Sequence, residues 1–356
     1  MKPLRMLVGL TAAATAAAIA TGPAAAAPSV DTLAEGLVGP LGLDVSKDGI
    51  YVAQNFAGSI DKVRRNGTLK NIASVVDASG LAVDGKRLVY TTTVFGDEGP
   101  TKAALKLRKA NGDVKHLASL LAFEKRRNPD ADVRYGVLGA TKSCREKMPR
   151  DARPHKGILD AHPYAVAEAK RGWYVADAAG NDIVHVSPKG KMRLVALLEP
   201  VVDRITKKMA AATGMPKCSV GLRYAAEPVP TDVEVAKNGS LVVSLLPGGP
   251  EDPAAGARGQ VVRINPKSGK QTMLADGLAG ATGVAIGKKK IYVAELFGGK
   301  ISQISRSGKV RRFKALNQPS AVEFFRGKVY ATTDTFPPES GPPNGKVVVL
   351  DPTPNR

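Results

Sequence analysis

The chain has 356 residues, a formal net charge of +20 and only 5% aromatic residues. This length is ample for a large folded domain, and the positive charge favours anionic surfaces as partners. The basic residues are scattered over turns and loops and form no stripe interleaved with aromatic side chains, so we expect no nucleic-acid binding.

The first 27 residues have the features of a leader. Lys2 and Arg5 form a short positive region, and residues 6–20 are apolar or small and carry no charge. Gly22 and Pro23 break this run before a stretch of alanines that offers cleavage sites. The pattern is typical of a secretory signal peptide over residues 1–27, with a retained anchor as the alternative. We expect a secreted, extracellular protein without a transmembrane span, because the run is short for a bilayer.

The rest of the chain, residues 28–356, repeats one pattern. Each copy has a small or polar first residue, an alternating apolar stretch, a turn and a second apolar stretch. The copies begin at Gly42, Gly80, Ala165, Asp232, Gly283 and Ala321. Alternation over four to six residues indicates half-buried strands, and repetition on this scale indicates a propeller. We predict an all-β fold, a six-bladed β-propeller.

The two ends of the chain are predicted to share one blade. The sixth copy ends at its third strand, residues 346–350, and no fourth strand follows. Residues 30–37 precede the first copy and resemble a fourth strand without a blade. Because an unpaired edge invites aggregation, we expect the N-terminal strand to complete the last blade and close the propeller.

All long segments are expected on one face of the propeller. Two insertions, 119–160 and 199–230, join successive blades, and loops 93–102, 247–259 and 334–344 join second to third strands. Long loops in compact domains are usually functional, so the binding face is predicted there. Segments 121–134 and 201–212 have helical patterns and are expected to cap the propeller.

The two cysteines, Cys144 and Cys218, lie one in each insertion. In an exported chain they can form a disulfide that joins the insertions, and two free buried thiols are the alternative. No His or Cys lies at ligand spacing around either residue, which excludes a thiolate zinc site.

Several motifs resemble a known family. They include Asp-Ala-His-Pro-Tyr at 160–164, Val-Ala-Asp-Ala-Ala-Gly-Asn-Asp at 175–182, and Pro-Gly-Gly-Pro-Glu-Asp-Pro at 247–253, followed by Gly-Ala-Arg-Gly at 256–259. The chain resembles the secreted ScyD/ScyE family proteins of actinobacteria over nearly its whole mature length. The resemblance implies a six-bladed propeller of the NHL/SMP-30 type. It implies no known activity and supplies no catalytic residues.

Polar residues at the ends of first and second strands should converge at the mouth of the central channel. The candidate ligand-binding residues are His162, Tyr164, Asp177, Asn181, Thr231, Asp232, Glu295 and Asp334. The carboxylates among them, Asp177, Asp232, Glu295 and Asp334, could hold a divalent cation, calcium or magnesium. The alternative is that these side chains cap turns and join blades by hydrogen bonds.

Three functions remain open from the sequence. The first is a monomeric secreted binding or scaffold protein for an unknown small molecule or protein, without catalysis. The second is a metal-dependent hydrolase or lyase, similar to a lactonase, in which the metal polarises a carbonyl. The third is a basic protein held by an anionic cell-wall polymer. The sequence has no nucleophile elbow and no phosphate-cradling glycine loop.

Overall fold

The computed structural model describes residues 28–249 and 256–352. The predicted signal peptide and part of the predicted loop 247–259 lie outside these residues. Strands make up most of the regular structure of the described chain and form seven four-stranded antiparallel sheets. None of its helices has the length and hydropathy needed to span a bilayer. The prediction of an all-β propeller fold is confirmed.

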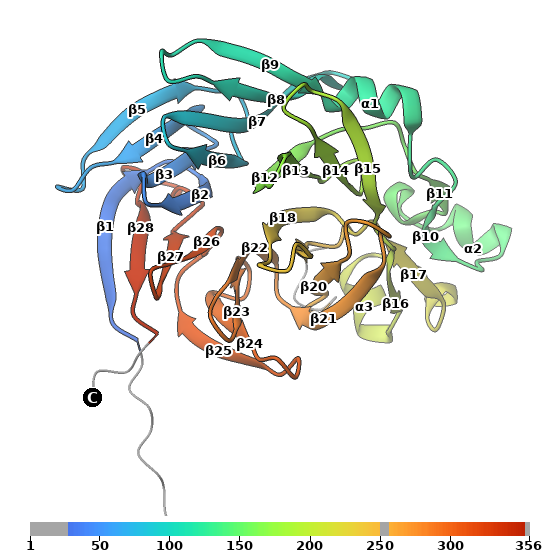
Figure 1. Cartoon of the computed structure of the whole chain (residues 1–356). Helices are drawn as coiled ribbons and strands as arrows, with labels where there is room; N and C mark the ends of the chain where they lie inside the picture. The colour runs from blue at the N-terminus through green and yellow to red at the C-terminus, as the bar shows by residue number, and fades with distance from the viewer. Residues whose placement is uncertain (1–27, 250–255, 353–356) are drawn as a thin grey trace, which may run out of the picture.

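Six of these sheets follow the repeat and are here called repeat sheets one to six. They are arranged around a common centre, with the first strand of each innermost (Figure 1). The strands of the first three are β2 (Pro40–Ser46), β3 (Gly49–Gln54), β4 (Ser59–Val63) and β5 (Leu69–Ser74); β6 (Leu81–Asp84), β7 (Arg87–Gly96), β8 (Gly99–Arg108) and β9 (Val114–Ser119); and β12 (Pro163–Ala169), β13 (Gly172–Asp177), β14 (Asp182–Val186) and β15 (Met192–Leu197).

The strands of the other three are β18 (Pro230–Val235), β19 (Leu241–Leu245), β20 (Gly259–Ile264) and β21 (Gln271–Leu278); β22 (Ala281–Ile286), β23 (Ile291–Glu295), β24 (Lys300–Ile304) and β25 (Val310–Ala315); and β26 (Val322–Phe325), β27 (Lys328–Thr333), β28 (Gly345–Leu350) and β1 (Val30–Leu37). The middle strands are buried on both faces, as at Val243, Val293 and Val329, each with 0% of its surface exposed. Neighbouring sheets therefore pack face to face through continuous apolar clusters, such as Ala176 and Ile183 against Val243.

The N-terminal strand belongs to the same sheet as the C-terminal strands. β1 pairs antiparallel with β28, with Val30 opposite Leu350 and Thr32 opposite Val348. The sheet order is β1, β28, β27, β26, so β1 is outermost (Figure 1). The edge of β28 that the sequence leaves without a fourth strand is thus covered.

The seventh sheet is built from both insertions, which the sequence analysis did not foresee. β10 (Arg134–Leu138) pairs with β11 (His155–Lys156) and with β17 (Arg223–Ala226), which also pairs with β16 (Val201–Arg204). This insertion sheet has its own apolar core, which includes Val137, Ile205 and Met209. It lies beside repeat sheets three and four rather than over the centre (Figure 1).

The predicted helices are shorter than expected. Helix α1 covers Leu120–Arg127, and its predicted continuation leads instead into β10. Segment 201–212 divides into β16 and helix α3 (Lys207–Ala212), because Thr206 caps the helix by accepting a hydrogen bond from the Met209 amide at 3.0 Å. The predicted loop 93–102 is also mostly strand, since β7 and β8 extend into a long hairpin.

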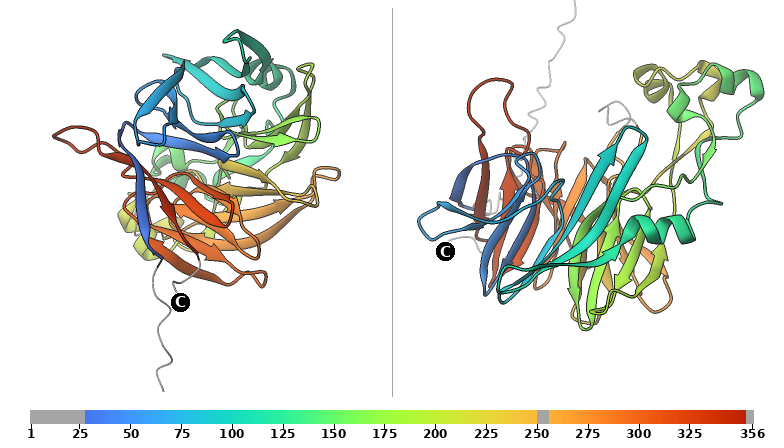
Figure 2. Two further views of the ribbon diagram at one scale, coloured as in Figure 1. Left: turned by 60° about the vertical axis from the view of Figure 1, so that its left-hand side comes forward. Right: turned by 90° about the horizontal axis from the view of Figure 1, so that it is seen from above.

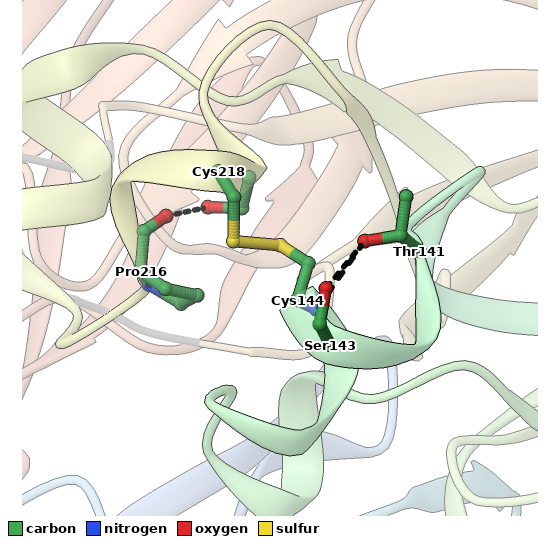
Figure 3. The surroundings of a disulfide bond; sticks show 6 residues. Thr141, Ser143, Cys144, Pro216 and Cys218 are labelled. Atoms are coloured by element: carbon green, nitrogen blue, oxygen red, sulfur yellow. Dashed lines mark hydrogen bonds between the residues drawn. A yellow bond between two sulfur atoms is a disulfide. The ribbon is translucent and has the colours of Figure 1, made fainter.

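The disulfide between Cys144 and Cys218 is confirmed. It joins helix α2 (Lys142–Glu146) of the first insertion to the short 3-10 turn Lys217–Ser219 of the second, with the two Cα atoms 5.9 Å apart (Figure 3). A second short 3-10 turn covers Arg150–Ala152. The bond therefore holds the two halves of the insertion sheet together.

The repeat sheets present two faces. The insertion face carries the connections between sheets and between second and third strands, and the turn face carries the other hairpin turns. The insertion sheet and loop 334–344 rise on the same side of the molecule (Figure 2).

Candidate functional site

The first strands converge on a narrow central cavity of about 40 Å³. Glycines allow this convergence: a Cβ on Gly42 would lie 1.8 Å from the Ser79 carbonyl oxygen, and one on Gly80 would lie 2.7 Å from the Cα of Ala165. Such a volume holds a few waters at most, whereas organic ligands need several hundred Å³. Any organic ligand at the centre must therefore sit at the mouth rather than in the cavity.

Thr231, one of the predicted site residues, joins two sheets. Its hydroxyl donates to the Ala281 carbonyl oxygen of the next sheet at 2.8 Å. At the next junction, between sheets five and six, the Thr282 hydroxyl donates to the Ser320 carbonyl oxygen at 2.8 Å. Between sheets six and one, the Ser320 hydroxyl donates to the Pro40 carbonyl oxygen at 3.0 Å. The hydroxyls at these strand starts thus bind backbone across three successive sheet junctions.

Asp177 and Glu295 occupy one structural position, the end of the second strand opposite the start of the first. Asp177 accepts hydrogen bonds from the His162 amide at 2.7 Å and the Gly180 amide at 3.1 Å. Glu295 accepts one from the Ala279 amide at 2.8 Å. Gln54, at the same position in sheet one, accepts one from the Val38 amide at 2.8 Å. These side chains fasten the connection that enters each sheet.

Asp232, Asn181 and Asp334 are also engaged with their surroundings. Asp232 accepts from the amides of Val233 and Val284, each at 2.8 Å, and so joins sheets four and five. Asn181 is fully buried, accepts from Val229 and donates to Asp130. Asp334 accepts from the side chains of Asn317 and Thr333, each at 2.8 Å.

The predicted metal set does not fit a shared ion. Within residues 28–249 and 256–352, no three His, Cys, Asp or Glu side chains are placed to hold one metal. Each of the four carboxylates Asp177, Asp232, Glu295 and Asp334 is engaged by amides or polar side chains of the protein. The arrangement favours the alternative, in which these side chains cap turns and join sheets.

His162 and Tyr164 differ, because they lie in a small polar cluster at the mouth. Nε2 of His162 is 2.8 Å from Oδ2 of Asp77, and Asn55 donates to the other Asp77 oxygen at 2.8 Å. These three residues come from the connections next to sheets three, two and one. Nδ1 of His162 makes no hydrogen bond within the described chain, so it is available to a ligand.

The rings of Phe95 and Tyr164 flank His162. The Phe95 ring, from the tip of the β7–β8 hairpin, meets the imidazole edge-on at 5.3 Å between centroids. The Tyr164 ring meets it edge-on at 5.6 Å. This aromatic setting fixes the imidazole plane and gives the mouth an apolar wall.

The Asp77 carboxylate and the His162 imidazolium stabilise one another's charges. Burial acts to raise the pKa of Asp77, but the hydrogen bond and charge of His162 outweigh it and hold this pKa below its usual value. Burial acts to lower the pKa of His162, but Asp77 outweighs it and raises this pKa. The pair therefore favours imidazolium with carboxylate, and the protonated ring would offer its Nδ1–H to an acceptor.

Exposed apolar side chains gather on the same face. Phe95 is 54% exposed, and Ile158 and Leu159 are 58% and 47% exposed in the segment that leads to His162. Phe56 and Phe336, half-exposed on sheets one and six, stack at 6.3 Å. Exposed apolar side chains of this kind are candidates for contact with a ligand or partner.

Carboxyl groups lie in and next to the central cavity: Asp232, Glu234 and Glu323 line it, and Asp44 follows Leu43, which also lines it. Burial raises the pKa of Asp44 to about 6 and that of Asp232 to about 7. Burial and these neighbours raise the pKa values of Glu234 and Glu323 as well. None of the residues that line the cavity in the described chain is basic, so no positive charge there offsets the rise in these pKa values.

Buried carboxyls also lie where α1 meets sheet three. Burial, followed by the charge of Asp177, raises the pKa of Glu124 to about 8. Asp182 is buried, and its Oδ1 has no hydrogen-bond partner within the described residues. Burial and the charge of Asp177 raise its pKa well above the usual range.

The sequence analysis missed Asp77 as a site residue. Asp77 lies three residues before Gly80, as His162 lies three residues before Ala165, so the two occupy the same position in successive copies. Aligning the copies on their connections as well as their strands would have placed both residues at the mouth.

No protein-family model and no curated protein matches the chain. Solved structures match its fold. The gluconolactonase from Xanthomonas campestris has a TM-score of 0.54 at 12% identity, covering 91% of this chain and 90% of that chain. The PQQ-bound aldose sugar dehydrogenase from Streptomyces coelicolor has a TM-score of 0.50 at 14% identity, covering 92% and 100%. A protein of unknown function from Bacteroides thetaiotaomicron has a TM-score of 0.55 at 10% identity, covering 91% and 76%. Since 328 chains match, and this fold serves different chemistries, the likeness shows the fold and does not choose a function.

Proposed function

We propose that the chain is a secreted, monomeric β-propeller that binds a small organic ligand at the mouth of its central cavity, on the insertion face. The observation that carries this proposal is the His162–Asp77 pair, with 2.8 Å between Nε2 and Oδ2, set between the rings of Phe95 and Tyr164. A polar anchor beside aromatic walls is the usual design of a small-molecule site.

The geometry also suggests the chemical class of the ligand. Asp77 engages Nε2 and favours the protonated ring, so Nδ1–H would donate to an acceptor such as a carbonyl or carboxylate oxygen. The exposed Phe95, Ile158 and Leu159 would contact an apolar or ring-shaped body. We therefore expect ring compounds that carry a carbonyl or carboxylate.

The fold and family belong to the same proposal. We propose that repeat sheets one to six are the blades of a six-bladed propeller and that β1 closes it; the pairing of β1 with β28 supports this. The motifs at 160–164 and 247–259 support membership of the secreted actinobacterial ScyD/ScyE family. Residues 1–27 would be the signal peptide that exports the chain.

Ligand-observed NMR with a set of aromatic and alicyclic carboxylates and lactones tests the site. His162→Gln should abolish saturation transfer to any compound that binds at the mouth, because it removes the charged donor. His185→Gln is the matched control, since His185 lies on β14 and is away from the mouth; its ring nitrogen is 2.8 Å from the Arg171 carbonyl oxygen, and its ring meets that of Tyr174 edge-on. Binding that survives in His162→Gln would refute the proposal.

A second candidate is a hydrolase or lyase in which His162 acts as general base. A carboxylate that orients an imidazole is the arrangement such a base requires, and the likeness to a gluconolactonase makes lactones reasonable substrates to try. The raised pKa of His162 predicts that turnover would rise toward alkaline pH. Hydrolysis of sugar lactones that is unaffected by EDTA and lost in His162→Gln would establish this function. Its absence would leave the binding function alone.

A further inference from the structure

Two open grooves lie on the turn face, away from the proposed ligand site. The first groove separates repeat sheets four and five and has a volume of about 680 Å³. Five basic side chains line it, and no acidic one does: Arg263, Lys288, Lys289, Lys290 and Arg306. They come from β20 and from the tight turns of sheet five.

The second groove separates sheets three and four and has a volume of about 720 Å³. Arg193, Arg263, Lys267 and Lys270 line it, again without an acidic side chain. Arg263 is common to both linings, so the two grooves adjoin on either side of one strand. Together they form a continuous basic surface across three sheets.

The charges of this surface are not neutralised by the protein. No ion pair within the described residues involves any of these basic groups; Lys290 donates to Gln303 at 2.6 Å, and Arg193 donates to a carbonyl oxygen at 3.3 Å. The equivalent of Arg263 in sheet one is Lys62, which donates to the Asp48 carbonyl oxygen at 2.7 Å and lies over the Tyr51 ring. In sheet four, Arg263 lies opposite Val242, where sheet one has Tyr51 opposite Lys62, and the Arg263 side chain is exposed.

We propose that the two grooves form one binding surface for a linear phosphodiester polymer without aromatic bases, such as a chain of polyol phosphates. Arginine forks match phosphate oxygens in bidentate geometry, and the Ser305 and Ser307 hydroxyls, which hydrogen-bond to each other at 2.9 Å, leave one further donor in the first groove. Two adjoining grooves suit an extended chain better than a single small anion.

The scarcity of aromatic side chains argues against nucleic acid. Proteins that bind single strands stack bases on aromatic platforms. The first groove has no aromatic residue, and the second has only Tyr174, whose ring meets His185 edge-on at 5.2 Å. A flexible polyol backbone requires no such platform.

Titration of the full chain with poly(glycerol phosphate) over a series of salt concentrations tests the proposal. Affinity should fall as salt rises, and Arg263→Gln should weaken binding about tenfold and lower the salt slope by about 0.7, the share of one phosphate contact on a single-stranded polyanion. Arg306→Gln should weaken binding about threefold, because Arg306 lines only one groove.

Arg65→Gln is the matched control for Arg306→Gln. Arg65 has the same place in the turn of sheet one, is equally exposed and loses the same charge. It should leave affinity within about twofold. Equal losses in Arg65→Gln and Arg263→Gln would reduce the effect to diffuse net charge and overturn the proposal.

Two further outcomes are decisive. Tighter binding of a single-stranded oligonucleotide or of polygalacturonate, at equal charge, would assign the surface to another polymer and refute the proposal. His162→Gln should leave the titration unchanged, so the proposal for the mouth and the proposal for the grooves can fail separately.

Discussion

The two faces of the molecule are made by the same six strand repeats, yet they differ in length of connection and in chemistry. The insertion face carries two long insertions, exposed aromatic rings and a His–Asp pair. The turn face has short turns whose Lys and Arg side chains line grooves. The strands are fixed by packing on both sides, so variation collects in the connections, where function is usually placed.

The largest expected difference in stability between the two faces comes from removing the disulfide. Replacing both Cys144 and Cys218 by Ser should destabilise the insertion sheet by about 4 kcal/mol, the chain-entropy estimate for the loop they close. Hydrogen exchange should accelerate in β10 and β17 while the strands of sheets five and six keep their protection. Equal acceleration in all sheets would show that the insertion sheet and the repeat sheets unfold as one unit.

The buried carboxyl groups make stability depend on pH. Asp44 and Asp232 have pKa values of about 6 and about 7 in the folded chain, raised by burial. These two groups therefore keep protons in the folded chain that the unfolded chain releases above about pH 4, so their contribution to stability is greatest at low pH and is lost as pH rises to about 7. We expect each of the two groups to contribute a loss of roughly 3 kcal/mol over this window, measured by urea unfolding.

The variant Glu234→Gln, compared with the unmodified chain, tests whether the cavity carboxyls cause this dependence of stability on pH. It removes one of the charges that raise the pKa of Glu323, so the loss of stability between these pH values should become smaller. The Asp77–His162 pair contributes in opposite directions, because Asp77 stabilises the fold above its lowered pKa and His162 does so below its raised one. Stability that rose steadily from pH 4 to 7 would contradict the raised pKa values of the cavity carboxyls.

The smallest expected effect contrasts single polar side chains on the two faces. Asp177→Ala leaves two buried amides, those of His162 and Gly180, without their acceptor, and should cost about 2 kcal/mol. Asn238→Ala removes a similar acceptor for the Ser240 amide in an exposed turn of the other face, where water replaces it, and should cost below about 0.5 kcal/mol. Asp177→Asn should be mild because Oδ1 accepts both bonds. Similar costs at the two positions would refute the assignment of Asp177 as a fastener of the sheet connection.

The repeat strands could be predicted from the sequence because their apolar alternation reports burial directly. The insertion sheet could not, since β10 and β17 are short, contain Arg134, Gly136 and Arg223, and pair across a whole repeat sheet. The candidate site was predicted in part. His162 was visible as a histidine at a strand start, and capping was one of two roles left open for Asp177 and Glu295. The sequence could not choose between capping and metal binding, because the capped groups are backbone amides. Every residue except proline has a backbone amide, so a hydrogen bond from an amide to a side chain requires no particular partner residue that the sequence could reveal.

The pairing of β1 with β28 affects the order in which the sheets can form. Val30 is among the first residues of the described chain to be synthesised, and Leu350, its partner, is among the last. No earlier strand occupies that position in the sheet, so β1 must wait, unpaired, until nearly the whole polypeptide exists. Contacts between such distant segments form slowly, so the last native contact to form should be this one. A chain that crosses a membrane unfolded would gain from that delay, since it could not complete its fold before its final residues had followed.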